Sequence, residues 1–241
     1  MKAIILAAGA SRRFGDYLRG KPKSTLQLGG RTLLQHQVSN LRAGGVDDFV
    51  VVKGYHPEDI VVPDSRCYLN PAFASTNMVH SLFCAVPEIE GEVIIAYADI
   101  VYETGIIEKL RTCDKAIAVA ADRKWADYYG QRYADALAEA ESFVIRNDGA
   151  IAEIGASKPP RESVHAQYMG LIRLNAEGAR TFRRAYDKFR AKFYKKLWIR
   201  NRVFESAYMT DFLQALIDDG ESVYPVLVEG GWLEFDSPED Y

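Results

Sequence analysis

Short apolar runs alternate with amphipathic stretches along the first half of the chain. Uninterrupted apolar runs are typical of strands buried on both faces of a parallel sheet. They cover residues 2–8, 49–52, 93–97 and 116–120. Residues 32–42 instead carry apolar side chains at helical spacing and end at Gly44-Gly45, which predicts a helix. The alternation through about residue 121 predicts a mostly parallel sheet with right-handed crossovers.

Two further helices are predicted inside this first half. Asn77 is expected to cap a helix whose inner face holds Leu82, Ala85 and Val86. Another helix is expected near 105–111, before the run at 116–120.

The pattern changes after residue 121. Residues 141–154 predict a β-hairpin, because Asn147-Asp148-Gly149 is a turn signal between two strand-like segments. Further elements are predicted as a strand at 170–174, helices from about 176 and about 209–218, a late strand at 223–228 and a closing segment at 230–236. The fold class is therefore α/β: one Rossmann-like, mostly parallel mixed sheet flanked by helices, with a small lobe in the later half. We expect one domain, 1–241, made of a core (about 1–121), a lobe with helices (about 122–222) and a returning strand (about 223–241).

Composition excludes several classes of function. Apolar residues make up 48% and charged residues 26% of the chain, and the net charge is −3, so no strong field favours nucleic acid or an anionic membrane. No apolar run is long enough for a membrane span or has the form of a signal peptide, which favours a cytoplasmic protein. The three cysteines and four histidines have no metal-ligand spacing.

The loop after the first strand has the chemistry of a polyphosphate site. Gly9 and small neighbours leave backbone N–H groups accessible, and two arginines followed by two lysines around a rigid proline supply fixed cations: Arg12, Arg13, Lys21 and Lys23. The spacing matches neither the P-loop nor the dinucleotide fingerprint, since no Gly-Lys-Ser/Thr follows and position 11 is Ser. An ordinary strand-to-helix loop with solvated charges is the alternative.

Two acidic segments are candidates for a magnesium site. Asp99 follows a buried strand, where open α/β sheets place ligand contacts. Glu234 and Asp236 alternate on a strand and so share one face. Carboxylates beside a triphosphate are what Mg²⁺ needs. The alternatives are a helix-capping Asp99 and a solvated edge strand.

These motifs resemble the nucleotidyltransferase superfamily. The resemblance rests on Leu6-Ala7-Ala8-Gly9, Arg13, Phe14-Gly15 and Lys21-Pro22-Lys23, in that order. Residues 75–85, 151–155 and 231–241 are similar to the branch that contains the phosphocholine and phosphonate cytidylyltransferases. Ser11-Arg12 departs from the pattern of many relatives and leaves the role of Arg12 open.

The resemblance implies a Mg²⁺-dependent enzyme that joins CMP from CTP to a small phosphate or phosphonate acceptor and releases pyrophosphate. It implies that Arg13 and Lys23 are catalytic. It implies nucleotide binding by Leu6, Ala7, Ala8, Gly9, Asn77 and Ser81. It implies metal binding by Asp99 and Asp236, with Glu234 as a helper.

An aromatic cluster is the candidate acceptor site in the lobe. Trp125, Tyr128 and Tyr129 lie near carboxylates and would hold an ammonium group by cation–π contact, with Lys158 reaching the acceptor. Packing of these rings within the lobe is the alternative. The basic helix at 183–196 is expected to be amphipathic with a solvated face, or else to line an anion cleft or a subunit contact.

Other functions remain as alternatives. Transfer to a sugar 1-phosphate or a molybdenum-cofactor-type acceptor competes within the same class of enzyme. A non-catalytic nucleotide-binding homologue would lack the metal carboxylates, and a dinucleotide oxidoreductase would need an acidic residue where Lys53-Gly54 stands. We expect no nucleic-acid or membrane partner, and a homodimer is compatible with the chain.

Overall fold

The computed structural model describes the backbone of residues 1–241 and all side chains except those of Arg12 and Asp16. The open role of Arg12 therefore concerns a side chain outside the described part. None of the described helices combines the length and the apolar character needed to cross a membrane.

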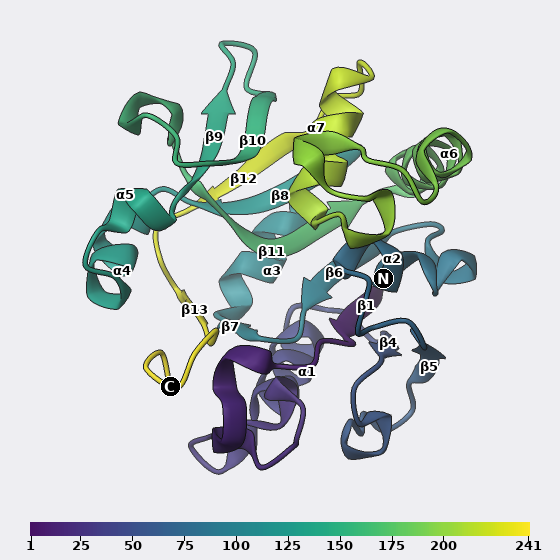
Figure 1. Ribbon diagram of the computed structural model, residues 1–241, viewed down its shortest axis with the longest axis vertical. Helices are drawn as coiled ribbons and strands as arrows, with labels where there is room; N and C mark the ends of the chain where they lie inside the picture. Colours follow the sequence, from purple (N-terminus) through teal and green to yellow (C-terminus); the bar gives the residue numbers. More distant parts are fainter.

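A seven-stranded sheet runs through the middle of the molecule (Figure 1). In spatial order its strands are β12 (Tyr224–Val228), β8 (Ile117–Asp122), β11 (Gln167–Leu174), β6 (Val93–Tyr97), β1 (Lys2–Ala7), β4 (Asp48–Lys53) and β5 (Arg66–Leu69). Only β11 runs antiparallel to its neighbours β6 and β8, and the other neighbouring pairs are parallel. The mixed, mostly parallel sheet predicted from the apolar runs is confirmed.

Side chains that alternate along β1 build two separate cores. Ile4 and Leu6 pack on one face against α2 (Met78–Phe83), α6 (Ala176–Phe193) and α7 (Met209–Asp218). Ala3 and Ile5 pack on the other face against α1 (Leu33–Ala43) and α3 (Thr104–Thr112). Both faces of the sheet are thus covered, which explains why its strands are apolar throughout.

Two of the predicted helices end earlier than expected. The basic helix expected over 183–196 belongs to α6, which ends at Phe193. Asn77 caps α2 as expected, but α2 ends at Phe83. Ala85 is buried, whereas Val86 lies beyond the helix and is exposed, so its assignment to the inner face is wrong. Residues Val86–Glu88 form a separate 3₁₀ turn with Pro87 near its start, where a proline is tolerated because its missing N–H would have no helical partner.

The later part of the chain adds small elements around the carboxyl ends of the strands. Figure 1 shows α4 (Trp125–Arg132) and α5 (Ala136–Glu139) at one side, and the hairpin of β9 (Glu141–Ile145) and β10 (Ile151–Ser157) projecting from the sheet. The closing segment β13 (Trp232–Glu234) pairs with β7 (Ile100–Tyr102). A short hairpin of β2 (Gln27–Leu28) and β3 (Arg31–Thr32) precedes α1.

The C-terminal residue lies beside the N-terminal loop. Tyr241 packs its ring edge-on against Tyr17 and donates a hydrogen bond to the carbonyl of Gln27. Figure 1 shows the last residues next to the turns that follow β1. The basic helix α6 buries Phe182, Tyr186 and Phe189 in the core, which is the amphipathic arrangement expected for it.

Candidate active site

A cleft of about 240 Å³ opens where β1 and β6 end. Its lining contains most of the candidate residues: Leu6, Ala7, Ala8, Gly9, Arg13, Lys23, Asn77, Ser81, Asp99 and Asp236. These positions come from several segments far apart in the chain, and the carboxyl ends of parallel strands bring them to one edge.

The floor of the cleft is held by backbone contacts between strand ends. The carbonyl of Leu6 accepts a hydrogen bond from the N–H of Ala98 at 3.2 Å, and the carbonyl of Ala8 accepts one from Tyr55 at 3.2 Å. Gly54 makes the second contact possible, because a Cβ atom there would lie 2.6 Å from the Ala8 oxygen. Glycine at position 54 thus has a local structural reason, because the chain must pass very close to the loop.

Ser11 joins the loop to the segment that carries Lys23. Its backbone has a φ of 52°, an uncommon conformation for a residue other than glycine. Its Oγ accepts a hydrogen bond from the N–H of Lys23 at 2.8 Å. Residues 23–25 form a single 3₁₀ turn that begins at this contact. Serine at position 11 therefore has a structural role in the described loop.

The ammonium group of Lys23 lies between two carboxylates. Its Nζ is 2.8 Å from Asp99 Oδ2 and 2.9 Å from Asp236 Oδ1. Arg13 Nη2 donates to the same Asp236 oxygen at 2.7 Å. Burial of Lys23 opposes its charged form, but the charges and hydrogen bonds of Asp99 and Asp236 outweigh this and raise its pKa.

The closing segment brings Asp236 to Asp99. β13 pairs antiparallel with β7, and the N–H of Phe235 then donates to the carbonyl of Asp99 at 2.9 Å. The fully buried Asp122 anchors the start of this segment. Its carboxylate accepts from the N–H of Gly230 at 2.8 Å and from Trp232 Nε1 at 3.0 Å.

Asp99 and Asp236 fit a divalent cation. Asp99 Oδ1 is buried and has no hydrogen-bond partner among the described residues. A buried carboxylate oxygen without a partner is costly unless something binds it. Hard oxygen donors beside a phosphate site are the set that Mg²⁺ prefers. The two residues are thus chemically suited to hold it.

Glu234 has a different partner. Its carboxylate Oε2 accepts a hydrogen bond from Arg132 Nη1 at 2.8 Å, and Glu234 is not part of the cleft lining. Burial, followed by the charges of Asp236 and Asp99, raises the pKa of Glu234 to about 7.

Arg132 links the lobe to the closing segment. Its side chain is only 6% exposed, and its Nε and Nη2 donate to the two oxygens of Asp240 at 2.8 and 3.1 Å. The same Asp240 carboxylate accepts from the N–H of Asp236 at 2.8 Å. Arg132 Nη2 also lies 3.8 Å from Asp236 Oδ2. Arg132 thus supports the backbone that presents Asp236 to the cleft.

The aromatic cluster predicted to hold an acceptor ammonium faces cations of the chain itself. The Arg132 guanidinium lies 5.2 Å from the ring centroid of Tyr128 and 5.8 Å from that of Tyr129. Arg161 lies 4.9 Å from the ring of Trp125, which is 1% exposed. Neither these three rings nor the exposed Lys158 belong to the cleft lining. The described contacts therefore match the packing alternative.

A buried amide behind the cleft was not identified from the sequence. Asn70 follows β5 and is fully buried, and its Nδ2 donates to Ser81 Oγ at 2.9 Å and to Thr76 Oγ1 at 3.0 Å. These bonds hold the wall to which Asn77 and Ser81 contribute. No strand is predicted at 66–69 from the sequence, so the strand-end signal that singles out Asp99 does not mark Asn70.

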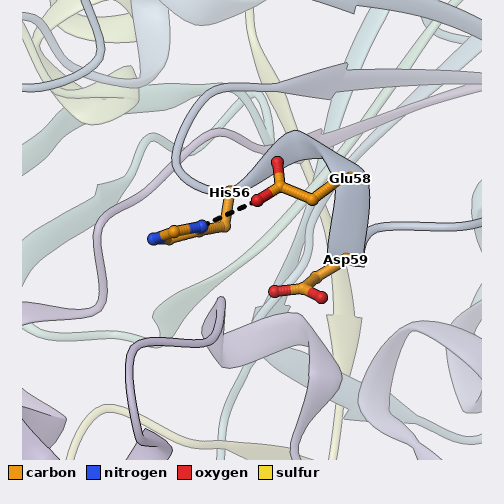
Figure 2. Close-up of side chains that lie close together, drawn as sticks. All are labelled: His56, Glu58 and Asp59. Atoms are coloured by element: carbon orange, nitrogen blue, oxygen red, sulfur yellow. Dashed lines mark hydrogen bonds and ion pairs between the residues drawn. The ribbon is translucent and has the colours of Figure 1, made fainter.

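One further group of side chains has the composition of a metal site. Figure 2 shows His56, Glu58 and Asp59 close together on a surface turn, with His56 Nδ1 2.8 Å from Glu58 Oε1. This hydrogen bond lowers the pKa of Glu58. All three residues are exposed, and exposed acidic groups are common without a metal.

Comparison with known proteins agrees with this geometry. Residues 3–156 match the family model of the MobA-like NTP transferase domain. The chain is 30% identical to CTP:phosphoglutamine cytidylyltransferase of Campylobacter jejuni, over 100% of its own length and 97% of that protein. It is also 30% identical, over 51% of its length, to 21% of the CMP-5'-(3-aminopropyl)phosphonate synthase of Streptomyces rubellomurinus.

A solved structure supports the fold. The CTP:phosphocholine cytidylyltransferase of Streptococcus pneumoniae superimposes with a TM-score of 0.73, covering 100% of this chain and 95% of that one at 20% identity. The match over more than half of the chain and the full-length relative lead to one conclusion. The chain is a nucleotidyltransferase and belongs to the family of MobA-like NTP transferase domains.

Proposed function

We propose that this enzyme transfers CMP from CTP to a small phosphorylated or phosphonate acceptor, depends on Mg²⁺ and releases pyrophosphate. The observation that carries the proposal is the convergence of Lys23, Asp99 and Asp236 in the cleft next to the Gly9 loop. The name of the full-length relative supports CTP as the donor and a phosphorylated small molecule as the acceptor.

The reaction needs charge neutralisation more than a nucleophilic side chain. An acceptor oxygen that is already anionic attacks the α-phosphorus of CTP in line, a P–O bond forms, and the bond to pyrophosphate breaks. Two anions must approach each other, so positioning and countercharge dominate the barrier. Lys23 and Arg13 are the described cations of the cleft lining, and we assign them to the phosphate oxygens.

Mg²⁺, held by Asp99 and Asp236, would neutralise charge on the phosphate groups of donor and acceptor. The residues of the chain have complementary tasks. The Gly9 loop presents its backbone to the triphosphate, since no side chain lies within 4 Å of the space that a Cβ at Gly9 would fill. Asn77 and Ser81 form the wall assigned to the nucleoside.

The experiment is a matrix of four nucleoside triphosphates against several acceptors, with pyrophosphate release as the readout. Acceptors are phosphocholine, phosphoethanolamine, 2-aminoethylphosphonate, phosphoglutamine and glucose 1-phosphate. We expect CTP to be preferred and release to require Mg²⁺. Equal rates with all four triphosphates would contradict cytidylyl transfer, and a clear preference for glucose 1-phosphate would favour the sugar-phosphate alternative.

Variants test the metal assignment. Asp99→Asn should reduce kcat by about 10²-fold or more, because it removes a charge that acts in the transition state. Asp114→Asn, at an exposed position outside the cleft, is the matched control. Full activity of Asp99→Asn would overturn the metal assignment. A cytoplasmic location and a homodimer stay predictions from the sequence.

A further inference from the structure

The segment that carries the two cations of the cleft has a small hydrophobic core of its own. Residues 11–28, which we call the cation loop, contain Arg13 and Lys23 of the cleft lining. The buried side chains of this small core belong to neither of the two sheet cores: Phe14, Leu18, Leu26, Leu33 and Phe235. Segments held by few buried contacts open at low free-energy cost, without unfolding of the rest of the molecule.

Phe235 is the member of this core that comes from the far end of the chain. It lies between Glu234 and Asp236 and is buried. Its backbone N–H donates to the carbonyl of Asp99, which fixes its place beside the cleft. The cation loop therefore packs on the same closing segment that presents Asp236.

Tyr241 covers this small core from outside. Its ring lies against Phe235, with 6.4 Å between the centroids, and against Tyr17, with 5.7 Å between the centroids. Its hydroxyl group donates to the carbonyl of Gln27. Tyr17 precedes the Lys23 turn and Gln27 follows it, so one side chain joins both arms of the cation loop. Figure 1 shows the last residues beside this loop.

The turn that leads to Tyr241 is firmly held. Asp240 accepts hydrogen bonds from the N–H groups of Asp236 and Ser237 at 2.8 and 2.9 Å. Arg132 donates to both oxygens of the same carboxylate. Tyr241 therefore extends from a braced turn, which makes it a fixed anchor for the cation loop.

We propose that Tyr241 and Tyr17 form a clasp that holds the cation loop over the triphosphate of the donor. The inference rests on the proposed function, since it assumes that Arg13 and Lys23 meet the triphosphate. The side chain of Arg13 is 66% exposed, so the backbone of the loop decides where its charge lies. Neither tyrosine lines the cleft, and both are positioning residues that act through the cations.

The clasp should act on the affinity for CTP and not on the rate at saturation. The apparent affinity of a ligand falls with the fraction of molecules in the binding-competent state. Saturating CTP itself holds the loop closed through Arg13 and Lys23. Loss of one aromatic contact shifts an opening equilibrium by about three- to tenfold. We therefore expect Tyr241→Ala and Tyr17→Ala each to raise KM for CTP by about twofold or more and to leave kcat unchanged.

A double-mutant cycle tests the contact between the two rings. Tyr17→Ala combined with Tyr241→Ala should raise KM by less than the product of the two single effects. Tyr241→Phe keeps the ring and should restore most of the affinity. Tyr194→Ala is the matched control, because Tyr194 lies outside the loop and the cleft and is as exposed as Tyr241, at 45 and 44%. Melting temperatures show that each variant is folded.

Tryptic cleavage after Arg19, an exposed residue of the cation loop, measures opening without the reaction. Cleavage follows the population of the open form when opening is fast. Tyr241→Ala should therefore be cut faster than the original chain, and Tyr194→Ala should not. CTP should slow the cleavage of both proteins, and Tyr241→Ala should need more CTP for half-maximal protection.

The possible results separate this inference from the proposed function. Pyrophosphate release with the KM and the cleavage rate of the original chain overturns the inference and leaves cytidylyl transfer intact. A lower melting temperature at unchanged KM also overturns it, because the rings then only stabilise the fold. No pyrophosphate release with any acceptor overturns the proposed function, and protection by CTP then decides on the clasp alone. The clasp is refuted if CTP gives no protection or protects Tyr241→Ala and the original chain equally.

Discussion

The ammonium group of Lys23 lies between the two carboxylates of the cleft lining. It contacts one oxygen of Asp99 and one of Asp236, and Arg13 shares the second carboxylate. In this arrangement Lys23 neutralises the carboxylates. In the proposed reaction the same ammonium group neutralises charge on phosphate oxygens. A positive charge at this position is therefore needed in both situations.

Replacing Lys23 by Met should lower kcat/KM by about 10²-fold or more, since one preorganised charge is lost from the transition state. Lys21→Met is the matched control, because Lys21 is exposed and not part of the cleft lining. Pyrophosphate release at saturating Mg²⁺ measures both variants. Similar losses for the two lysines would mean that only the overall charge of the loop matters.

The protonation of Glu141 predicts a pH dependence of stability. Burial raises its pKa from the usual 4.5 to about 7, so the folded chain holds this proton more tightly than the unfolded chain. The resulting stabilisation is complete below about pH 4.5 and is lost as the pH rises through about 7. In Glu141→Gln this loss should be absent. The melting temperature of Glu141→Gln minus that of the original chain should therefore increase between about pH 5 and about pH 8.

The comparison isolates Glu141 because Glu234, whose pKa is raised in the same direction, is present in both proteins. The charged neighbours Arg200, Arg202 and Asp211 also stay unchanged. Two melting curves that run parallel across this range would contradict the assignment of the raised pKa.

At the scale of elements, α4 acts on the closing segment through Arg132. Arg132→Met should leave Glu234 and Asp240 without their main partner and reduce the free energy of unfolding by about 3 kcal/mol or more. Because Asp240 supports the backbone of Asp236, the Mg²⁺ concentration for half-maximal activity should rise. Denaturant unfolding and a Mg²⁺ titration measure the two effects.

Arg132→Lys keeps the charge and should recover part of the Mg²⁺ response. Arg161→Met is the control, because Arg161 lies over Trp125 in the same lobe without touching the closing segment. An unchanged Mg²⁺ requirement in Arg132→Met would show that Arg132 only stabilises the lobe.

The strands were more predictable than the contacts of single side chains. The runs that became β1, β4, β6 and β8 are buried on both faces, and such burial leaves an uninterrupted apolar signal. Asp99 was found because strand ends carry ligands. The cation that contacts Tyr128 and Tyr129 could not be identified from the sequence. The spacing of the aromatic residues indicates a cation-binding surface, but it does not indicate that Arg132, three positions after Tyr129, occupies that surface.

Across the whole molecule, contacts between segments far apart in the chain determine features that local sequence patterns do not specify. β11 inserts antiparallel between β6 and β8, and a single apolar strand carries no sign of its direction. Arg132, Glu234 and Asp240 meet although no motif spans them, since α4, β13 and the last residues of the chain supply one residue each. Such a cluster depends on tertiary structure and has no local signature.

The bond between Arg132 and the closing segment constrains how this enzyme can be re-engineered. An exchange of the segment that contains α4 and α5 for that of a relative would carry Arg132 away while Glu234 and Asp240 stay behind. Such a chimera would contain two acids without their countercharge, whatever acceptor the new segment recognises. Recombination between relatives should therefore succeed only when α4 and the last residues of the chain are inherited together.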